Sequence, residues 1–182
     1  MSPTSTSTLS RSALVELAER SLQGVVQGLA AELEVVVHPD ATNREAVDEP
    51  PATRGHGPAA FVATSAWLEA AFSDLAWSSE EHVVDGDLVV SFGRMSGCHT
   101  GEFVVWTEDG GIERVFVPTG KTFSVRQAHF QRVADGQVVE HWAVRDDQGM
   151  AMQLGWIPPT PAFLFRCARA TRRARKALAR QR

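Results

Sequence analysis

The stretch from Val125 to Asp146 reads VRQAHFQRVADGQVVEHWAVRD, and it decides the fold expected for this chain. Two extended runs flank Asp135-Gly136, a pair that favours the type I′ turn of a β-hairpin, because both central residues of that turn need a positive φ. With these two residues in the loop, counting outward pairs Val125 with Asp146. The sequence therefore predicts a long antiparallel hairpin.

Side chains alternate between the two faces of a strand, so this register predicts which residues share a face. One face should combine an amide, an imidazole, an aromatic ring and a carboxylate, which is typical of the wall of an apolar pocket with a polar tip. Its residues are Gln127, His129, Trp142, Val144 and Asp146. The opposite face should carry Ala128, Phe130, His141, Ala143 and Arg145, which excludes His141 from the pocket.

Upstream of the hairpin, apolar residues at steps of three and four predict two helices. The first runs from about Leu14 to Leu33, with Gly24 and Gly28 inside it, where we expect close packing of the helix on a sheet. The second begins near Pro58, a residue that suits a first helical turn, and its apolar stripe ends at Phe72. Between them, several prolines and glycines from Pro39 onward predict a long irregular crossing.

From residue 77 onward the pattern becomes that of strands. Runs at 77–84 and 88–99 flank one predicted turn, runs at 102–107 and 112–117 flank another, and a short helix is expected over 147–154. Helices followed by a series of antiparallel strands indicate an α+β domain.

Composition and charge bound the remaining organisation. We expect a disordered leader at 1–8, one domain at 9–157 and a basic C-terminal tail at 158–182. The tail should be helical or disordered, with its start anchored on the domain by Phe163, Leu164 and Phe165, and it should be dispensable for folding. Eight Arg and Lys residues lie from Arg166 onward, and no acid lies beyond Asp147, so the remaining body is acidic. An acidic body argues against nucleic-acid binding by the domain.

Other sites and locations are also constrained. No run reaches the roughly 20 apolar residues of a membrane helix, so no membrane insertion is expected. Cys98 and Cys167 are too few for a disulfide framework or a zinc site, and no His, Asp or Glu cluster has the spacing of metal ligands. We expect a cytoplasmic protein without a metal.

Several motifs resemble the SnoaL-like polyketide cyclase family of the nuclear transport factor 2-like superfamily. They occur in the family's order between about residues 34 and 157, and that order makes the set more specific than any single motif. They are His38-Pro-Asp40 with Asn43, Ala71-Phe-Ser-Asp-Leu75, His99-Thr-Gly-Glu-Phe103, Pro118-Thr-Gly-Lys121, Arg132 to Trp142, Asp146, and Gln153-Leu-Gly155. The chain departs from the family at Arg44, where a His is usual, and at residues 104–117, which are inserted and predict a lid or a reshaped mouth.

The resemblance implies a cone-shaped barrel, in which a curved antiparallel sheet wraps on N-terminal helices and encloses the ligand. It also implies a cofactor-independent intramolecular aldol closure of a polyketide ester, with Asp146 as the general acid and base. One carboxylate can perform both proton transfers if the substrate carbons lie within hydrogen-bond reach. From the residues alone, Asp146 is equally a helix-capping aspartate just before the last helix.

The remaining candidates surround this carboxylate. His129 could support the enolate oxygen or be a buried structural histidine. The residues expected to contact the substrate are Gln127, Trp142, Asn43, Val144, His99 and Phe72, of which His99 has a structural alternative.

Two other function classes stay open at this stage. One is another enzyme on the same cone, such as a pericyclic cyclase, a ring hydroxylase or an epoxide-opening enzyme. The other is a protein that binds a small hydrophobic ligand without turnover. We also expect a homodimer, because Phe130, Ala128 and Ala143 should form an apolar patch on the outer face of the sheet.

Overall fold

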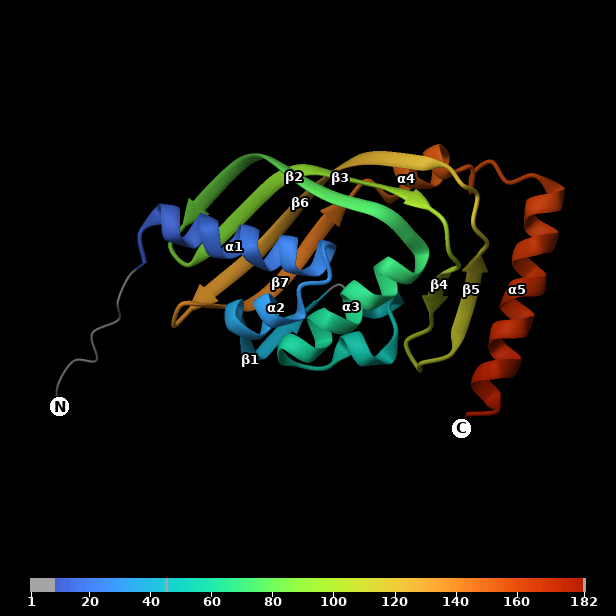
Figure 1. Ribbon diagram of the computed structural model, residues 1–182, viewed down its shortest axis with the longest axis horizontal. Helices are drawn as coiled ribbons and strands as arrows, with labels where there is room; N and C mark the ends of the chain where they lie inside the picture. The colour runs from blue at the N-terminus through green and yellow to red at the C-terminus, as the bar shows by residue number, and fades with distance from the viewer. Residues whose placement is uncertain (1–8, 45, 182) are drawn as a thin grey trace.

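The computed structural model describes residues 9–44 and 46–181 (Figure 1). One mixed sheet has the strand order β1-β7-β6-β3-β2, and a separate two-stranded sheet pairs β4 with β5. All neighbouring strands are antiparallel except β1 and β7, which are parallel. The predicted α+β class is confirmed, with helices inside a curved sheet. The leader predicted at 1–8 lies outside the described residues.

The N-terminal segment forms two helices where the sequence predicted one. Helix α1 (Arg11–Val26) begins at Ser10, whose side chain accepts a hydrogen bond from Ala13 N, and α2 spans Ala30–Val36. Gly28 adopts a φ of 68°, which breaks the helix at low cost because glycine has no Cβ. A Cβ at Gly24 would lie 2.8 Å from Leu33 Cδ2, so this glycine permits helix-on-helix packing rather than the predicted helix-on-sheet packing.

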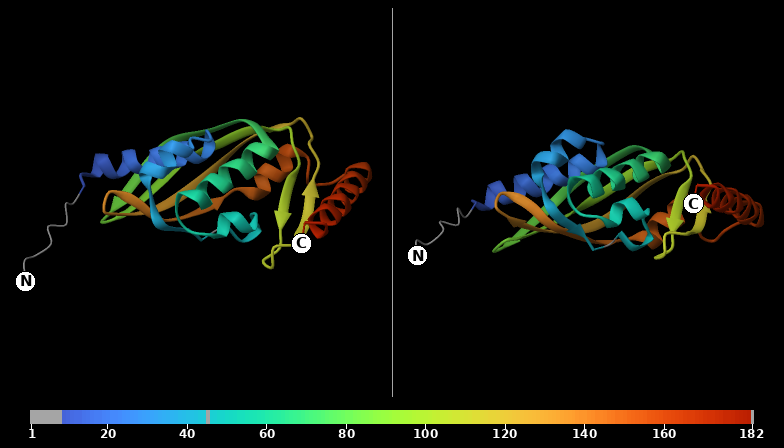
Figure 2. Two further views of the ribbon diagram at one scale, coloured as in Figure 1. Left: turned by 60° about the horizontal axis from the view of Figure 1, so that its bottom comes forward. Right: turned by 90° about the horizontal axis from the view of Figure 1, so that it is seen from below.

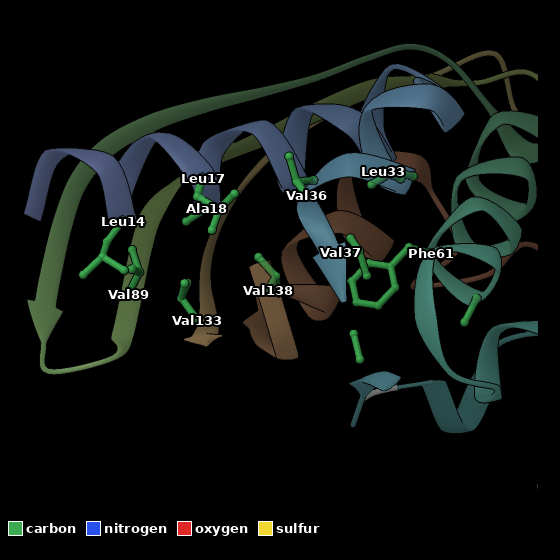
Figure 3. Close-up of a cluster of buried hydrophobic side chains, with 12 residues drawn as sticks. Leu14, Leu17, Ala18, Leu33, Val36, Val37, Phe61, Val89, Val133 and Val138 are labelled. Carbon is green, nitrogen blue, oxygen red and sulfur yellow. The ribbon is translucent and has the colours of Figure 1, made fainter. Parts of the chain in front are cut away.

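Helices α1 and α2 cover one end of the concave face of the sheet (Figures 1 and 2). A buried apolar cluster fills the space between these helices and the sheet, and Figure 3 shows its side chains pointing toward one another from helices and strands. Its members include Leu14, Leu17, Ala18, Leu33, Val36, Val37, Phe61, Val89, Val133 and Val138. Burial of the predicted apolar stripe therefore fixes the helices on the sheet.

The crossing from residue 37 to residue 56 is more ordered than predicted. It contains strand β1 (Val37–Asn43) and two short 3-10 helices, η1 (Ala46–Asp48) and η2 (Pro51–Arg54). The Arg54 guanidinium secures this segment by donating to five carbonyls, those of Ala46, Val47, Glu49, Thr107 and Glu108. Helix α3 (Gly57–Ala71) follows, and Pro58 lies in its first turn as predicted.

Long strands follow α3: β2 (Phe72–Asp85), β3 (Leu88–His99), β6 (Thr122–Ala134) and β7 (Gln137–Arg145). The predicted Asp135-Gly136 turn is confirmed, with φ values of 50° and 77°. Its predicted register is wrong beyond the first residues. Val133 pairs with Val138, but Arg132 pairs with Glu140, so Val139 is an extra residue that forms a β-bulge in β7.

The inserted hairpin and the tail extend the cone at its far end (Figure 1). Strands β4 (Phe103–Trp106) and β5 (Ile112–Phe116) pair with each other, and helix α4 (Asp147–Leu154) lies where it was predicted. Helix α5 (Pro161–Ala179) packs beside β5. None of the helices in the described ranges is long and apolar enough to cross a membrane.

The tail is a packed helix rather than a free basic arm. Of its three predicted anchors, only Phe163 is buried, whereas Leu164 and Phe165 are exposed. Cys167 and Ala170 are also buried, and the Arg175 guanidinium donates to the carbonyls of Ile112 and Glu113. The helix thus covers the inserted hairpin.

Deleting residues 168–182 is therefore expected to destabilise the protein, in contrast to the dispensability predicted from sequence. The deletion uncovers Ile112 and Val115, and burial of one such side chain is worth about 1.5–3 kcal/mol. Urea unfolding should show a loss of at least about 2 kcal/mol. An unchanged free energy of unfolding would show that α5 is detachable.

Candidate active site

A cavity of about 330 Å³ lies between the sheet, helices α1 and α3, and the inserted hairpin. Most of its wall is apolar, and the hairpin contributes three of the wall's side chains, Phe103, Val105 and Phe116. The other apolar lining residues are Leu22, Val25, Val26, Phe61, Trp67, Leu68, Phe72, Leu75, Met95, Phe123, Met150 and Trp156. The inserted hairpin therefore forms a wall of the cavity, which accounts for its apolar side chains.

Five polar lining groups come from three neighbouring strands. Gln127 and His129 lie on β6, His141 and Arg145 on β7, and Asn43 on β1. His129 pairs across the sheet with Ala143, and Gln127 pairs with Arg145. Because directly opposite residues share a face, the amide, both imidazoles and the guanidinium border the same space.

Four of these side chains form one hydrogen-bonded chain. Gln127 Oε1 lies 2.9 Å from His129 Nε2, His129 Nδ1 lies 3.0 Å from His141 Nε2, and His141 Nδ1 lies 3.1 Å from Asn43 Oδ1. Both nitrogens of His129 are thus engaged by protein partners. Trp77 also packs edge-on against the His129 ring, with centroids 4.8 Å apart.

Burial keeps both imidazoles neutral. Desolvation lowers the pKa of His129 well below its ordinary value, with smaller contributions from His141 and Arg145. Desolvation followed by Arg145 lowers the pKa of His141 to about 4. At neutral pH the two rings therefore carry one proton each.

Proton counting limits the chain to two directions. Amide oxygens at both ends would require three protons on the two rings, because an amide oxygen only accepts. Rotating either the Asn43 or the Gln127 amide, in which oxygen and nitrogen are interchangeable in shape, satisfies all three contacts with neutral rings. With Asn43 rotated, Asn43 donates to His141, His141 to His129, and His129 to Gln127 Oε1; with Gln127 rotated, every donor is reversed.

The direction in which Asn43 donates leaves the Gln127 amide nitrogen for a ligand. Gln127 lines the cavity, and no acceptor contacts its Nε2 among the residues that the structure describes. Its two N–H groups can donate to a ligand oxygen, and the chain behind it polarises the amide. Arg145 lies directly across the strand pair and adds positive charge beside that oxygen.

Glu49 is the buried carboxylate of the cavity. It lies between η1 and η2, is 3% exposed, and accepts a hydrogen bond of 2.8 Å from Thr64 Oγ1 on α3. Burial raises its pKa, against the lowering effects of Thr64, Arg145, Thr53 and Arg54. The other two carboxylates of the described lining, Asp48 and Asp147, are exposed.

Comparisons with known proteins agree with this fold. The model of the SnoaL-like polyketide cyclase family matches residues 17–154. The chain belongs to this family. DnrD of Streptomyces peucetius, an aklanonic acid methyl ester cyclase, is 31% identical over 148 residues, which are 81% of this chain and 94% of that protein. A nogalonic acid methyl ester cyclase of Streptomyces nogalater is 32% identical over 133 residues, 70% of this chain and 87% of that protein.

Solved structures share the fold. TsrD from Streptomyces laurentii superposes with a TM-score of 0.63 at 25% identity, over 81% of this chain and 98% of that one. AclR from Streptomyces galilaeus, described as a putative hydroxylase, superposes with a TM-score of 0.60 at 21% identity, over 82% of this chain and 100% of that one. At that identity the likeness to AclR shows the fold alone.

Two of the residues predicted to contact substrate face away from the cavity of this SnoaL-like protein. The bulge at Val139 reverses the faces of β7, so Trp142 and Val144 lie on the outer face and His141 and Arg145 on the inner one. Trp142 stacks on Phe130 with centroids 5.2 Å apart, and Val144 is 65% exposed. Their predicted places in the pocket, and the exclusion of His141, were wrong.

Asp146 also lies away from the place predicted for it. Its Oδ1 accepts a hydrogen bond of 2.8 Å from Gly149 N, so it is the N-cap of α4, and its side chain is exposed and outside the cavity lining. This is the capping alternative that the sequence left open. Its role in proton transfer stays a prediction.

The remaining predicted residues divide between lining and support. Gln127, His129, Asn43 and Phe72 line the cavity. His99 is fully buried behind the lining, where its ring packs against Phe72 and Trp156, so the structure favours its structural alternative. Among residues 9–44 and 46–181, no three His, Cys, Asp or Glu side chains are grouped so that they could hold a metal ion.

Three functional candidates were missed from sequence: His141, Arg145 and Glu49. The first two were assigned to the outer face by counting, because nothing local marks Val139 as a bulge. Glu49 lies in a proline-rich crossing where no periodicity applies. The Pro50-Pro51 pair beside it was the available signal of a structured, functional loop.

Proposed function

We propose that this protein closes a ring in a polyketide ester by an intramolecular aldol reaction. The observation that carries the proposal is the cavity between the sheet, helices α1 and α3 and the inserted hairpin, which joins long apolar walls to one polar end with an amide donor, a guanidinium and a buried carboxylate. An apolar polyketide fits the walls, and an enolate that forms at the polar end meets donors already in place. Membership of the SnoaL-like cyclase family supports the same reaction.

The reaction needs two proton movements and no external electrons. A base removes a proton from a carbon between two carbonyl groups, and the C–H electron pair becomes an enolate. The enolate carbon attacks a second carbonyl carbon of the same molecule, and the alkoxide formed there takes a proton. The product is an isomer of the substrate.

The Gln127 N–H groups and Arg145 are suited to the enolate oxygen. Charge that develops on this oxygen is stabilised most by donors that are fixed before the reaction. Gln127 is fixed by His129, which is fixed in turn by His141 and Asn43. In this assignment Gln127 touches the substrate, and His129 acts as a positioning residue.

Aklanonic acid methyl ester and nogalonic acid methyl ester, the compounds in the names of the relatives, are the first substrates to test. Conversion should give a product of unchanged mass with a new chromatographic retention. A product heavier by one oxygen would indicate a hydroxylase instead. Saturable binding of both esters without any product would indicate a ligand-binding protein.

We also propose a cytoplasmic homodimer that pairs through the outer face of the sheet. This face carries the stacked Phe130 and Trp142 rings together with Ala128 and Val144, and Ala143 drops out of the predicted patch because it faces inward. Both cysteines are free, which suits a reducing compartment.

Val144→Lys is expected to weaken dimerisation at least about tenfold. A two-fold interface would place the new charge twice against an apolar surface. Light scattering at micromolar concentration should show a dimer for the wild type and a monomer for the variant. A monomeric wild-type protein would refute this interface.

A further inference from the structure

We propose that Glu49 is the catalytic carboxylate of this cavity, which takes the proton from the substrate carbon and returns it to the alkoxide. This assignment rests on the proposed function and moves the role from Asp146 to a residue 97 positions earlier in the chain. It adds a segment of the irregular crossing to a site otherwise built on strands.

Glu49 lies in the cavity wall, and Asp146 does not. Of the three carboxylates that line the described cavity, Glu49 alone is buried, and Asp146 is absent from the lining. A base must lie within hydrogen-bond reach of the carbon acid, directly or through one water. Asp146 instead binds Gly149 N at the start of α4.

Glu49 shares the cavity with the residues proposed to hold the enolate oxygen. Glu49, His129, His141 and Arg145 line the same cavity, and Arg145 acts electrostatically on the other three. The carboxylate thus borders the space that also holds Gln127, which lies directly across the sheet from Arg145. A substrate oxygen on the Gln127 amide would place the adjacent C–H bond in this shared space.

The state of the carboxylate suits a base. No ion pair within 4.0 Å neutralises Glu49 among the described residues, and burial raises its pKa above the ordinary glutamate value. A raised pKa makes the carboxylate a stronger base, and a catalyst works best when its pKa approaches the operating pH. The neighbouring imidazoles have depressed pKa values and are weaker bases.

The proton balance closes on this one residue. The carbon acid loses a proton to a Glu49 oxygen as the C–H bond breaks, and the enolate forms. After the C–C bond forms, the Glu49 carboxylic acid gives the same proton to the alkoxide oxygen. Glu49 returns to the carboxylate, and nothing is oxidised or reduced.

Glu49→Gln tests this role with little structural change, because the amide oxygen can still accept the hydrogen bond from Thr64. We expect kcat on the two methyl esters to fall by about 10²–10⁴, the usual contribution of general acid–base catalysis. Glu140→Gln makes the same substitution in a surface ion pair with Arg44, and its rate should stay within about twofold of the wild type. Asp146→Asn, the rival, should retain most of the rate and most of the stability, because Asn and Asp are equally good N-caps.

A pH profile separates catalysis from a structural role. The acidic limb of kcat/KM should lie above the ordinary glutamate range, because the base must be ionised. Thr64→Val removes a hydrogen bond that lowers the pKa of Glu49, so the limb should move to higher pH. Charged groups facing Glu49 from neighbouring elements, Arg54 on η2 and Arg145 on β7, stay in place in that variant. A limb that does not move would argue against Glu49.

Proton exchange at a carbon acid tests Glu49 as the base without requiring ring closure. Methyl acetoacetate in D2O exchanges its C2 protons, and NMR should show faster exchange with the wild type than with Glu49→Gln. If the wild type cyclises an ester and Glu49→Gln is equally fast, Glu49 is not the base but the proposed function stands. If only the exchange is catalysed and Glu49→Gln loses it, the assignment stands and cyclisation of these esters fails. A wild type that does neither overturns both.

Discussion

Replacing Gln127 with leucine is expected to lower kcat on a cyclised ester by about 10²–10³. Loss of one preorganised oxyanion donor has an effect of this size. KM should change much less, because the donor acts mainly on charge that develops in the transition state. Steady-state kinetics on the ester that the wild type converts would measure both parameters, and a raised KM with unchanged kcat would make Gln127 a substrate-binding residue only.

His129 offers a graded comparison with Gln127. Both of its nitrogens bind protein partners, so His129→Ala should act through Gln127 and cost less, about tenfold in kcat. His129→Ala combined with Gln127→Leu should be no slower than Gln127→Leu alone, because the support has nothing left to hold. Additive losses would instead show that His129 contacts the substrate itself.

Acidification is expected to destabilise the fold between about pH 6.5 and pH 4. Burial lowers the pKa of His99 to about 4, from an ordinary value of 6.5. In this window the unfolded chain binds a proton that the folded chain does not, so the free energy of unfolding falls as pH falls. A shift of this size corresponds to about 3 kcal/mol. His129 and His141 act in the same direction, whereas Glu49, whose pKa is raised, acts in the opposite one.

His99→Phe tests this origin, because a ring of similar shape replaces the imidazole between Phe72 and Trp156. Urea unfolding at a series of pH values should show a shallower loss of stability for the variant, smaller by about 3 kcal/mol across the window. Its stability at pH 7.5, where His99 is neutral in both states, measures the packing change together with the loss of the contacts that His99 Nδ1 makes with Thr119 and Trp156. Parallel pH dependences for the two proteins would rule out His99 as a source.

Local sequence signals determined the turns and the fold class. Asp135-Gly136 specified its own hairpin turn because few other residues accept two positive φ values in succession. The same chemistry located Gly86, with a φ of 60°, between β2 and β3. Apolar spacing placed α3, and the ordered motifs led to the family and its cone. Gln127 and His129 were correctly assigned to the cavity because the bulge lies in β7 and leaves the alternation of side chains along β6 unchanged.

The tertiary structure alone decided which residues complete the site. One additional residue at Val139 turned His141 and Arg145 inward and Trp142 and Val144 outward, because side chains in a strand alternate with a period of two. Glu49 reaches the cavity from a loop fixed by Arg54, through contacts made by residues distant along the chain. The packing of helix α5 also depends on residues distant along the chain. Its apolar face is buried because the inserted hairpin offers an apolar surface for it to cover.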